Sequence, residues 1–181
     1  MTGIDDRAGR YLADFTDLSR RCRERGGRLA EFLQHDRVVA LQWPDDVVEQ
    51  WLYDHSDKNA FLVDYGHIDL SAVAWHGETL PVAELLTLPT GLSDGEVIDE
   101  YAADHDHWVE RRRHLGVPQF WETDGTWMRP PLLIDQGLLG LGEGLQVIEG
   151  RTRMGVLRGR SRDGRHAARE HLVWVGRCSP R

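Results

Sequence analysis

Cysteine, lysine and long apolar runs are all scarce in this chain of 181 residues. The two cysteines, Cys22 and Cys178, are too few for a disulfide framework, which indicates a reducing, cytoplasmic environment. No stretch approaches the roughly 18 consecutive apolar residues of a membrane-spanning helix. The opening Met1–Asp6 is acidic and not basic and then apolar, so the sequence predicts no secretory signal. These absences favour a cytoplasmic protein that does not enter a membrane.

Charge is unevenly distributed. Lys58 is the only lysine among 22 basic residues, and we interpret the arginine excess mainly as base-composition bias. Residues 150–181 hold nine arginines against two acids, a balance of +7; because the whole chain carries −8, the first 149 residues carry −15. A net charge of −8 argues against a general coat for DNA or an anionic membrane. A local anion site in the basic C-terminal part stays open.

The first two thirds of the chain read as mainly helical. The apolar spacing predicts helices at residues 5–25, 29–33, 44–55, 80–88 and 94–114. The run Arg37–Leu41 is β-like, and residues 68–75 are ambiguous between helix and strand. No repeat, low-complexity tract or linker marks a domain boundary, so we expect one domain over residues 1–181.

The last third predicts a compact α/β unit. Its order is strand, glycine-rich turn, strand, helix and strand, at residues 131–134, 137–144, 145–148, 151–157 and 172–175. The expected fold class is therefore α/β (α+β), with a small mixed sheet and a helical N-terminal extension. We divide the chain into a mainly helical part, residues 1–115, and a phosphate-binding part, residues 116–181.

The most informative segment runs from the apolar strand 145–148 into a helix. Gly150 permits a sharp turn and leaves backbone N–H groups unshielded by a Cβ atom. The helix that follows would direct its positive N-terminus at the strand end, where Thr152, Arg151 and Arg153 can contact an anion. Glu149 precedes the turn and could hold a metal ion, a substrate hydroxyl or a neighbouring arginine. Together these residues predict a phosphate-binding corner.

Here the sequence resembles the ParB/sulfiredoxin superfamily, whose members carry a strand, a Gly-x-x-Arg box and a helix. Gly150-Arg151-Thr152-Arg153 looks like that box, followed by small and apolar residues at 154–157. Upstream, residues 125–134 resemble the family's pattern of glycine, proline and then a β-strand. The match covers about residues 120–176, roughly a third of the chain.

The resemblance implies a nucleotide site where the box meets phosphates, with ATP or CTP and magnesium as cofactors. The upstream loop would place Trp127 and Arg129 near that ligand. Two family functions are disfavoured, because the box lacks the cysteine of sulfiredoxin and too few residues follow it for a helix-turn-helix domain. We expect a nucleotide- or phosphate-binding protein, with phosphoryl transfer or nucleotide hydrolysis as the reaction class and Glu149 as the candidate catalytic residue. An exposed Arg153 should be dispensable for the fold.

Alternative interpretations stay open. The protein could be a non-catalytic interaction module with the same fold, with a protein partner unknown, or a nucleic-acid-binding or nuclease domain. On a continuous helix, His107, Glu110 and His114 would share a face and could hold a metal, but a polar solvated helix explains them more simply. We therefore predict no metal ligands. Aromatic residues before the corner could stack on a base, although most tryptophans fill cores: Trp108, Phe120, Trp121 and Trp127.

Overall fold

The computed structural model describes residues 9–24 and 28–179, which form a mixed α+β fold. The strands are β1 (Val73–Pro81), β2 (Leu132–Asp135), β3 (Leu145–Glu149) and β4 (Glu170–Cys178). The α-helices are α1 (Thr16–Glu24), α2 (Leu29–Leu33), α3 (Asp36–Val39), α4 (Asp45–Val48), α5 (Asn59–Tyr65), α6 (Val82–Leu85), α7 (Val97–Ala103), α8 (His105–Glu110), α9 (Val117–Asp124) and α10 (Arg151–Arg162). Short 3₁₀ turns lie between them, and α4 continues into a π-helical segment, η2 (Glu49–Tyr53).

The four strands form one mixed sheet in the order β1-β4-β2-β3. β1 and β4 pair antiparallel along their whole length, β4 and β2 pair parallel, and β2 and β3 form an antiparallel hairpin. β1 therefore brings a strand from the first 115 residues to the edge of a sheet whose other strands come from the last third. The expected fold class is confirmed.

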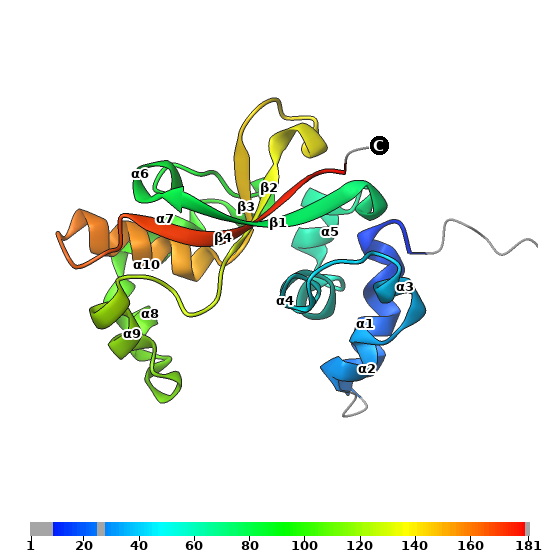
Figure 1. Cartoon of the computed structure of the whole chain (residues 1–181), viewed down its shortest axis with the longest axis horizontal. Coiled ribbons are helices and arrows are strands. Elements are labelled where there is room, and N and C mark those ends of the chain that lie inside the picture. Colours follow the sequence, from blue (N-terminus) through cyan, green and yellow to red (C-terminus); the bar gives the residue numbers. More distant parts are fainter. Residues whose placement is uncertain (1–8, 25–27, 180–181) are drawn as a thin grey trace, which may run out of the picture.

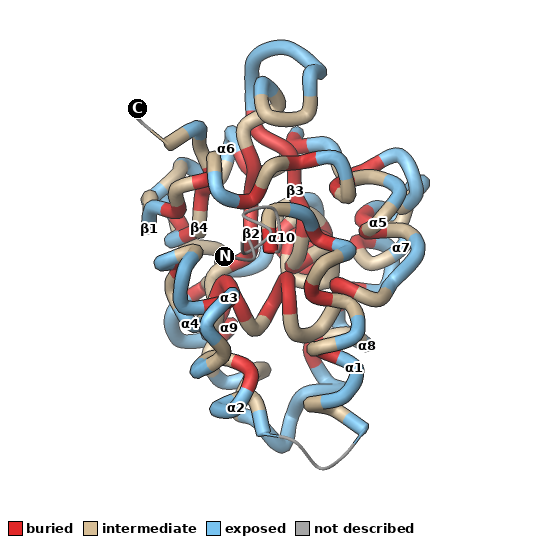
Figure 2. The backbone as a smooth tube through the Cα atoms, turned by 90° about the vertical axis from the view of Figure 1, so that its right-hand side faces the viewer, coloured by how far each residue is buried: buried red, intermediate tan, exposed pale blue. Residues whose placement is uncertain are grey.

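Helices cover both faces of the sheet (Figure 1). Alternate residues of β2 point to opposite sides, since Leu132 and Ile134 pack with the N-terminal helices while Leu133 packs against α10. The core between the sheet and the N-terminal helices is rich in aromatic rings, among them Trp43 and Trp51, which stack at a centroid distance of 5.4 Å. The buried segments converge on the central strands and α10 (Figure 2). No helix within the described ranges is long and apolar enough to cross a membrane.

Several sequence predictions need correction. The β-like run Arg37–Leu41 instead contains α3, because the His35 ring caps the helix by accepting the Arg37 N–H at 3.3 Å and Val38 is buried in the core. The expected helix at 80–88 is only α6, since Leu80 and Pro81 complete strand β1.

Two more expected helices are shorter than predicted. The predicted helix at 94–114 breaks at Asp104, whose φ of −125° and ψ of 47° are not helical, so α7 and α8 are separate. The helix predicted at 5–25 begins at Leu12 as a 3₁₀ turn that continues into α1, and its ends at 5–8 and 25 lie outside the described residues. The helix at 44–55, the helix at 29–33 and the three C-terminal strands are confirmed within one to four residues.

Candidate functional site

The predicted corner is present at the junction of β3 and α10. Gly150 caps the helix with a φ of +96°, in the left-handed region that glycine adopts without strain. A Cβ atom at this position would lie 2.4 Å from the Cβ atom of Pro131, the residue before β2. The turn therefore also needs glycine because the backbone of residue 150 passes close to Pro131. The first backbone N–H groups of α10 have no intrahelical partner, as in any α-helix, and no cap side chain accepts from them.

A cavity of about 520 Å³ opens at this corner, a volume typical of small-molecule sites. All seven residues proposed from the sequence for catalysis or phosphate binding line it: Trp127, Arg129, Glu149, Gly150, Arg151, Thr152 and Arg153. The opposite wall comes from α7, α8 and the turn after α8: Tyr101, Trp108, Val109, Arg112 and Leu115. The cavity therefore lies between the corner and a helical wall that the sequence did not connect to it.

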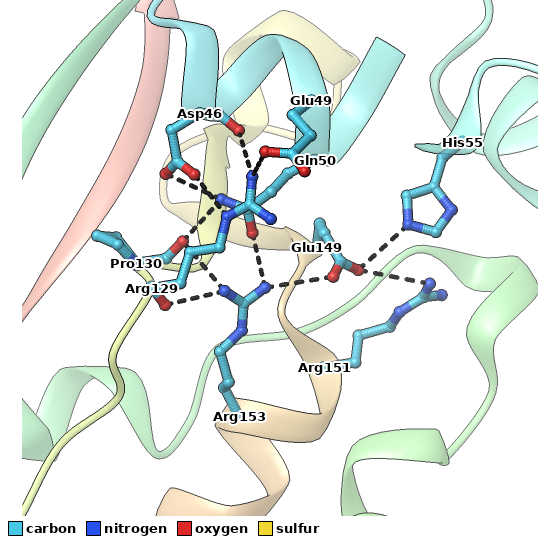
Figure 3. Close-up of polar contacts among 9 residues, drawn as sticks. All are labelled: Asp46, Glu49, Gln50, His55, Arg129, Pro130, Glu149, Arg151 and Arg153. Atoms are coloured by element: carbon cyan, nitrogen blue, oxygen red, sulfur yellow. Dashed lines mark hydrogen bonds and ion pairs between the residues drawn. The ribbon is translucent and has the colours of Figure 1, made fainter. Parts of the chain in front are cut away.

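Arg153 is not exposed as the sequence suggested; its side chain is 19% accessible, and both of its terminal nitrogens donate hydrogen bonds. Its Nη1 donates to the carbonyl oxygens of Arg129 and Pro130 at 2.8 and 3.3 Å, and its Nη2 donates to Gln50 Oε1 at 2.7 Å and Glu149 Oε1 at 3.2 Å (Figure 3). Burial lowers the pKa of Arg153, and the Glu149 carboxylate partly offsets that effect. Arg153 thus joins the corner to the helix at 44–55 and to the loop before β2.

Glu149 is shared by three cationic or titratable groups (Figure 3). Besides Arg153, its Oε2 lies 3.9 Å from Arg151 Nη2 and 3.7 Å from His55 Nε2. The His55 ring stacks on Phe61 at a centroid distance of 4.2 Å, and burial lowers the pKa of His55 although Glu149 opposes that shift. Glu149 lines the cavity, with Oε1 accepting a hydrogen bond from Arg153 and Oε2 facing Arg151 and His55 at longer distances.

The other two arginines of the predicted site are also paired. Arg151 forms an ion pair with the buried Asp94, and its guanidinium lies 5.1 Å from the Phe61 ring centroid. Arg129 contacts Asp46 at 2.5 Å and Glu49 at 2.6 Å. Because each guanidinium already faces a carboxylate, the positive charge of the corner is largely neutralised within the protein.

Trp127 belongs to the core more than to the cavity. It is buried, its indole N–H donates to the Leu172 carbonyl at 2.7 Å, and its ring lies 4.7 Å from His171. The half-buried Trp108 on the helical wall contacts Tyr101 edge to face at 4.7 Å. Trp108 is therefore the more accessible of these two cavity tryptophans for stacking.

Sequence reasoning missed the contribution of the helix at 44–55. The π-helical segment η2 widens the turn, and Gln50 within it and Asp54 directly after it both line the cavity. Burial raises the pKa of Asp54, and the carboxylates of Glu49 and Glu149 raise it further. Within the described residues the Asp54 carboxylate has no hydrogen bond or ion pair. Only the long separation in sequence concealed these residues.

Arg112 was also missed as a cavity residue. It is exposed at the end of the α8 wall, and its charge acts on Arg153 across the cavity. Among the residues that the structure describes, its guanidinium forms no ion pair or hydrogen bond. The sequence treated the run of arginines at 111–113 as a helix C-terminal charge cluster, which did not distinguish Arg112 from its neighbours.

The metal interpretation of the polar helix finds no support in the geometry. α8 ends at Glu110, and His114 lies in a separate 3₁₀ turn at Arg113–Leu115, so the three residues do not share one helical face. Across residues 9–24 and 28–179, no group of three or more His, Cys, Asp or Glu side chains could hold a metal ion.

No protein-family model, curated protein or solved structure matches this chain. The resemblance of residues 120–176 to the ParB/sulfiredoxin superfamily therefore stays a prediction that rests on the motif itself. The function must be argued from the cavity.

Proposed function

We propose that this protein binds a small phosphorylated ligand, with a nucleotide as the best candidate. The observation that carries the proposal is the uncapped N-terminus of α10 at the wall of a 520 Å³ cavity. The backbone N–H groups of a first helical turn and the helix dipole together favour an anion. Gly150 keeps that approach open because it has no side chain.

Two further groups support an anionic ligand. The hydroxyl of Thr152 lines the cavity and makes no hydrogen bond among the described residues. Arg112 contributes a positive charge that no described carboxylate neutralises. The arginines of the corner act differently: Arg151 and Arg153 hold the helix N-terminus in place, and a phosphate would meet their outer edges.

The apolar part of the cavity suits a nucleobase. Tyr101 and Trp108 present aromatic surface, and Leu115 and Met128 are exposed hydrophobic side chains at 55% and 54% accessibility. Apolar and aromatic walls with a few polar groups are typical of small-molecule sites, and bases stack on aromatic rings. A ligand with an anionic end and a flat apolar end matches both walls.

ATP or CTP with magnesium, which the resemblance implies, fits this donor set. Magnesium is commonly held by one or two carboxylates together with phosphate oxygens, and the Glu149 carboxylate lines the cavity beside the start of α10. A bound magnesium ion would neutralise phosphate charge. We propose binding and not phosphoryl transfer or hydrolysis, because the Glu149 carboxylate already faces Arg153, Arg151 and His55 within the protein.

Ligand-induced stabilisation tests the proposal, since a ligand that binds the native state raises the melting temperature. We expect ribonucleoside di- or triphosphates to raise the melting temperature. Each nucleotide is tested with and without magnesium. Thr152→Val should reduce the shift, whereas Thr79→Val, an exposed threonine on β1, should not. The proposal is wrong if no nucleotide or pyrophosphate shifts the melting temperature. Tight duplex DNA binding at physiological salt would favour the nucleic-acid alternative instead.

A further inference from the structure

The carboxylate of Asp54 lies in the cavity without a protein partner. Asp54 follows η2 directly, one turn beyond Gln50, and it is partly buried. The other cavity carboxylate, Glu149, already forms ion pairs with Arg151 and Arg153. The half-buried Asp54 carboxylate therefore keeps both oxygens available to accept hydrogen bonds from a ligand in the cavity.

We propose that Asp54 binds the sugar hydroxyls of the ligand, so that the cavity selects ribonucleotides over nucleotides without vicinal hydroxyls. The inference rests on the proposed function and deepens it, because it assigns the part of the ligand that lies between phosphate and base. A carboxylate can accept one hydrogen bond from each of two adjacent hydroxyl groups.

The position of Asp54 supports a sugar contact and not a base contact. Gln50, one turn before Asp54, accepts a hydrogen bond from Arg153 of α10. Of the four charges that act on the Asp54 carboxylate, Arg129 and Glu149 line the cavity at the corner, whereas Glu49 and Arg23 do not line it. None of them belongs to the wall formed by α7 and α8, where the aromatic rings lie. In a nucleotide the sugar is the group next to the phosphate, and a phosphate at the start of α10 would place the sugar beside that corner.

The electrostatics of Asp54 also favour a ligand that donates hydrogen bonds to it. Burial and the nearby carboxylates raise its pKa, so its charged form is destabilised in the free protein. Donors that approach this carboxylate would relieve that penalty on binding. A site built to hydrogen-bond a hydroxyl rejects the analogue that lacks it much more strongly than an apolar pocket rejects a missing methylene.

The experiment compares each ribonucleoside triphosphate (of adenine, cytosine, guanine and uracil) with its 2′,3′-dideoxy counterpart by isothermal titration calorimetry. Wild type should bind at least one ribonucleotide at least tenfold more tightly than its dideoxy partner, the effect of one hydrogen bond to a charged group. Asp54→Ala should bring that ratio close to one. Asp45→Ala is the matched control, because Asp45 is an exposed acid on α4 that does not line the cavity.

The melting temperature of each unliganded variant separates binding from folding. We expect Asp54→Ala to be at least as stable as wild type, because the change removes a carboxylate with no partner. An equal affinity of wild type for ribo- and dideoxynucleotides overturns the proposal while leaving phosphate binding intact. So does an Asp54→Ala variant that keeps the wild-type ratio. If neither nucleotide nor pyrophosphate binds, the proposed function itself fails.

Discussion

The two walls of the cavity differ in how far their side chains are already engaged. On the corner wall, Arg153, Arg151 and Glu149 form hydrogen bonds and ion pairs to one another and to elements far away in the sequence. On the helical wall, Arg112 has no described partner and Leu115 is largely exposed. The charges most conspicuous in the sequence motif therefore assemble the site, whereas less conspicuous groups are free to meet a ligand.

The largest effect should come from Arg153→Ala. The change leaves the Arg129 carbonyl and Gln50 Oε1 without a donor, removes one of the two donors to the Pro130 carbonyl, and removes the Arg153 partner of Glu149. Each buried or half-buried polar group left without a partner costs about 1 to 3 kcal/mol, so we expect a loss of about 3 kcal/mol of unfolding free energy. Urea denaturation measures it. A loss below about 0.5 kcal/mol, the size of an ordinary surface substitution, would show that the corner wall is not structural.

Gly150→Ala should come next. The substitution places a Cβ atom where φ is +96° and where Pro131 lies 2.4 Å away, and strain of this kind costs about 2 kcal/mol. Gly164→Ala is the matched control, because Gly164 also has a positive φ of +65° but its Cβ atom would meet open space. Urea denaturation should show a clearly larger loss for Gly150. Equal losses would mean that backbone conformation alone, and not the approach to Pro131, requires glycine there.

The same contrast explains what sequence reasoning could reach. A strand, a glycine turn and a helix are local features, so the corner and the three C-terminal strands follow from residues within about fifty positions of one another. The pairing of β1 with β4, and the contact of Gln50 with Arg153, join residues about 100 positions apart. Hydrophobic periodicity carries no information on such pairs.

The sequence also could not show which arginine side chains form contacts within the protein. Nothing in the local sequence distinguishes Arg153, which is half-buried and hydrogen-bonded, from the exposed Arg112. The long helix predicted at 94–114 failed for a related reason. The hydrophobic pattern of the sequence continues across Asp104 and therefore predicts one helix. In the fold, α7 and α8 each pack against α10, and the chain breaks between them at Asp104.

Glu149→Gln should have a smaller effect than either change above. The variant keeps the shape of the side chain and removes the negative charge that faces Arg153, Arg151 and His55. We expect a loss of about 1 to 2 kcal/mol, because the amide oxygen can still accept one hydrogen bond. Glu143→Gln, an exposed acid in the β2–β3 hairpin, is the control. Unchanged stability together with a large fall in nucleotide turnover would instead support the catalytic role that the sequence suggested.

His55 should contribute a modest pH dependence. Because burial lowers its pKa in the folded state, the unfolded chain binds more protons, and stability rises with pH in this range. The free energy of unfolding is therefore highest above the unfolded pKa of about 6.5, and it decreases as the pH falls below that value and the unfolded chain takes up the proton. His55→Phe should flatten the fall in melting temperature between pH 7.5 and 5.5. An identical fall in the variant would assign the acid sensitivity to other groups.

Arg112→Ala should have the smallest effect on stability and a clear effect on binding. An exposed arginine without a described partner contributes within about 0.5 kcal/mol to folding, so the melting temperature of the unliganded protein should not change. A charge at the cavity mouth does contribute to anion binding, and we expect magnesium-free nucleotide to bind several-fold more weakly, with the difference shrinking as salt is raised. Arg113→Ala is the matched control, because Arg113 pairs with Glu110 at 2.6 Å and does not line the cavity. If Arg112→Ala lowers stability as much as Arg153→Ala, the two walls do not differ as their contacts indicate. If Arg112→Ala and Arg113→Ala both bind nucleotide with wild-type affinity, the start of α10 holds the anion without a contribution from Arg112.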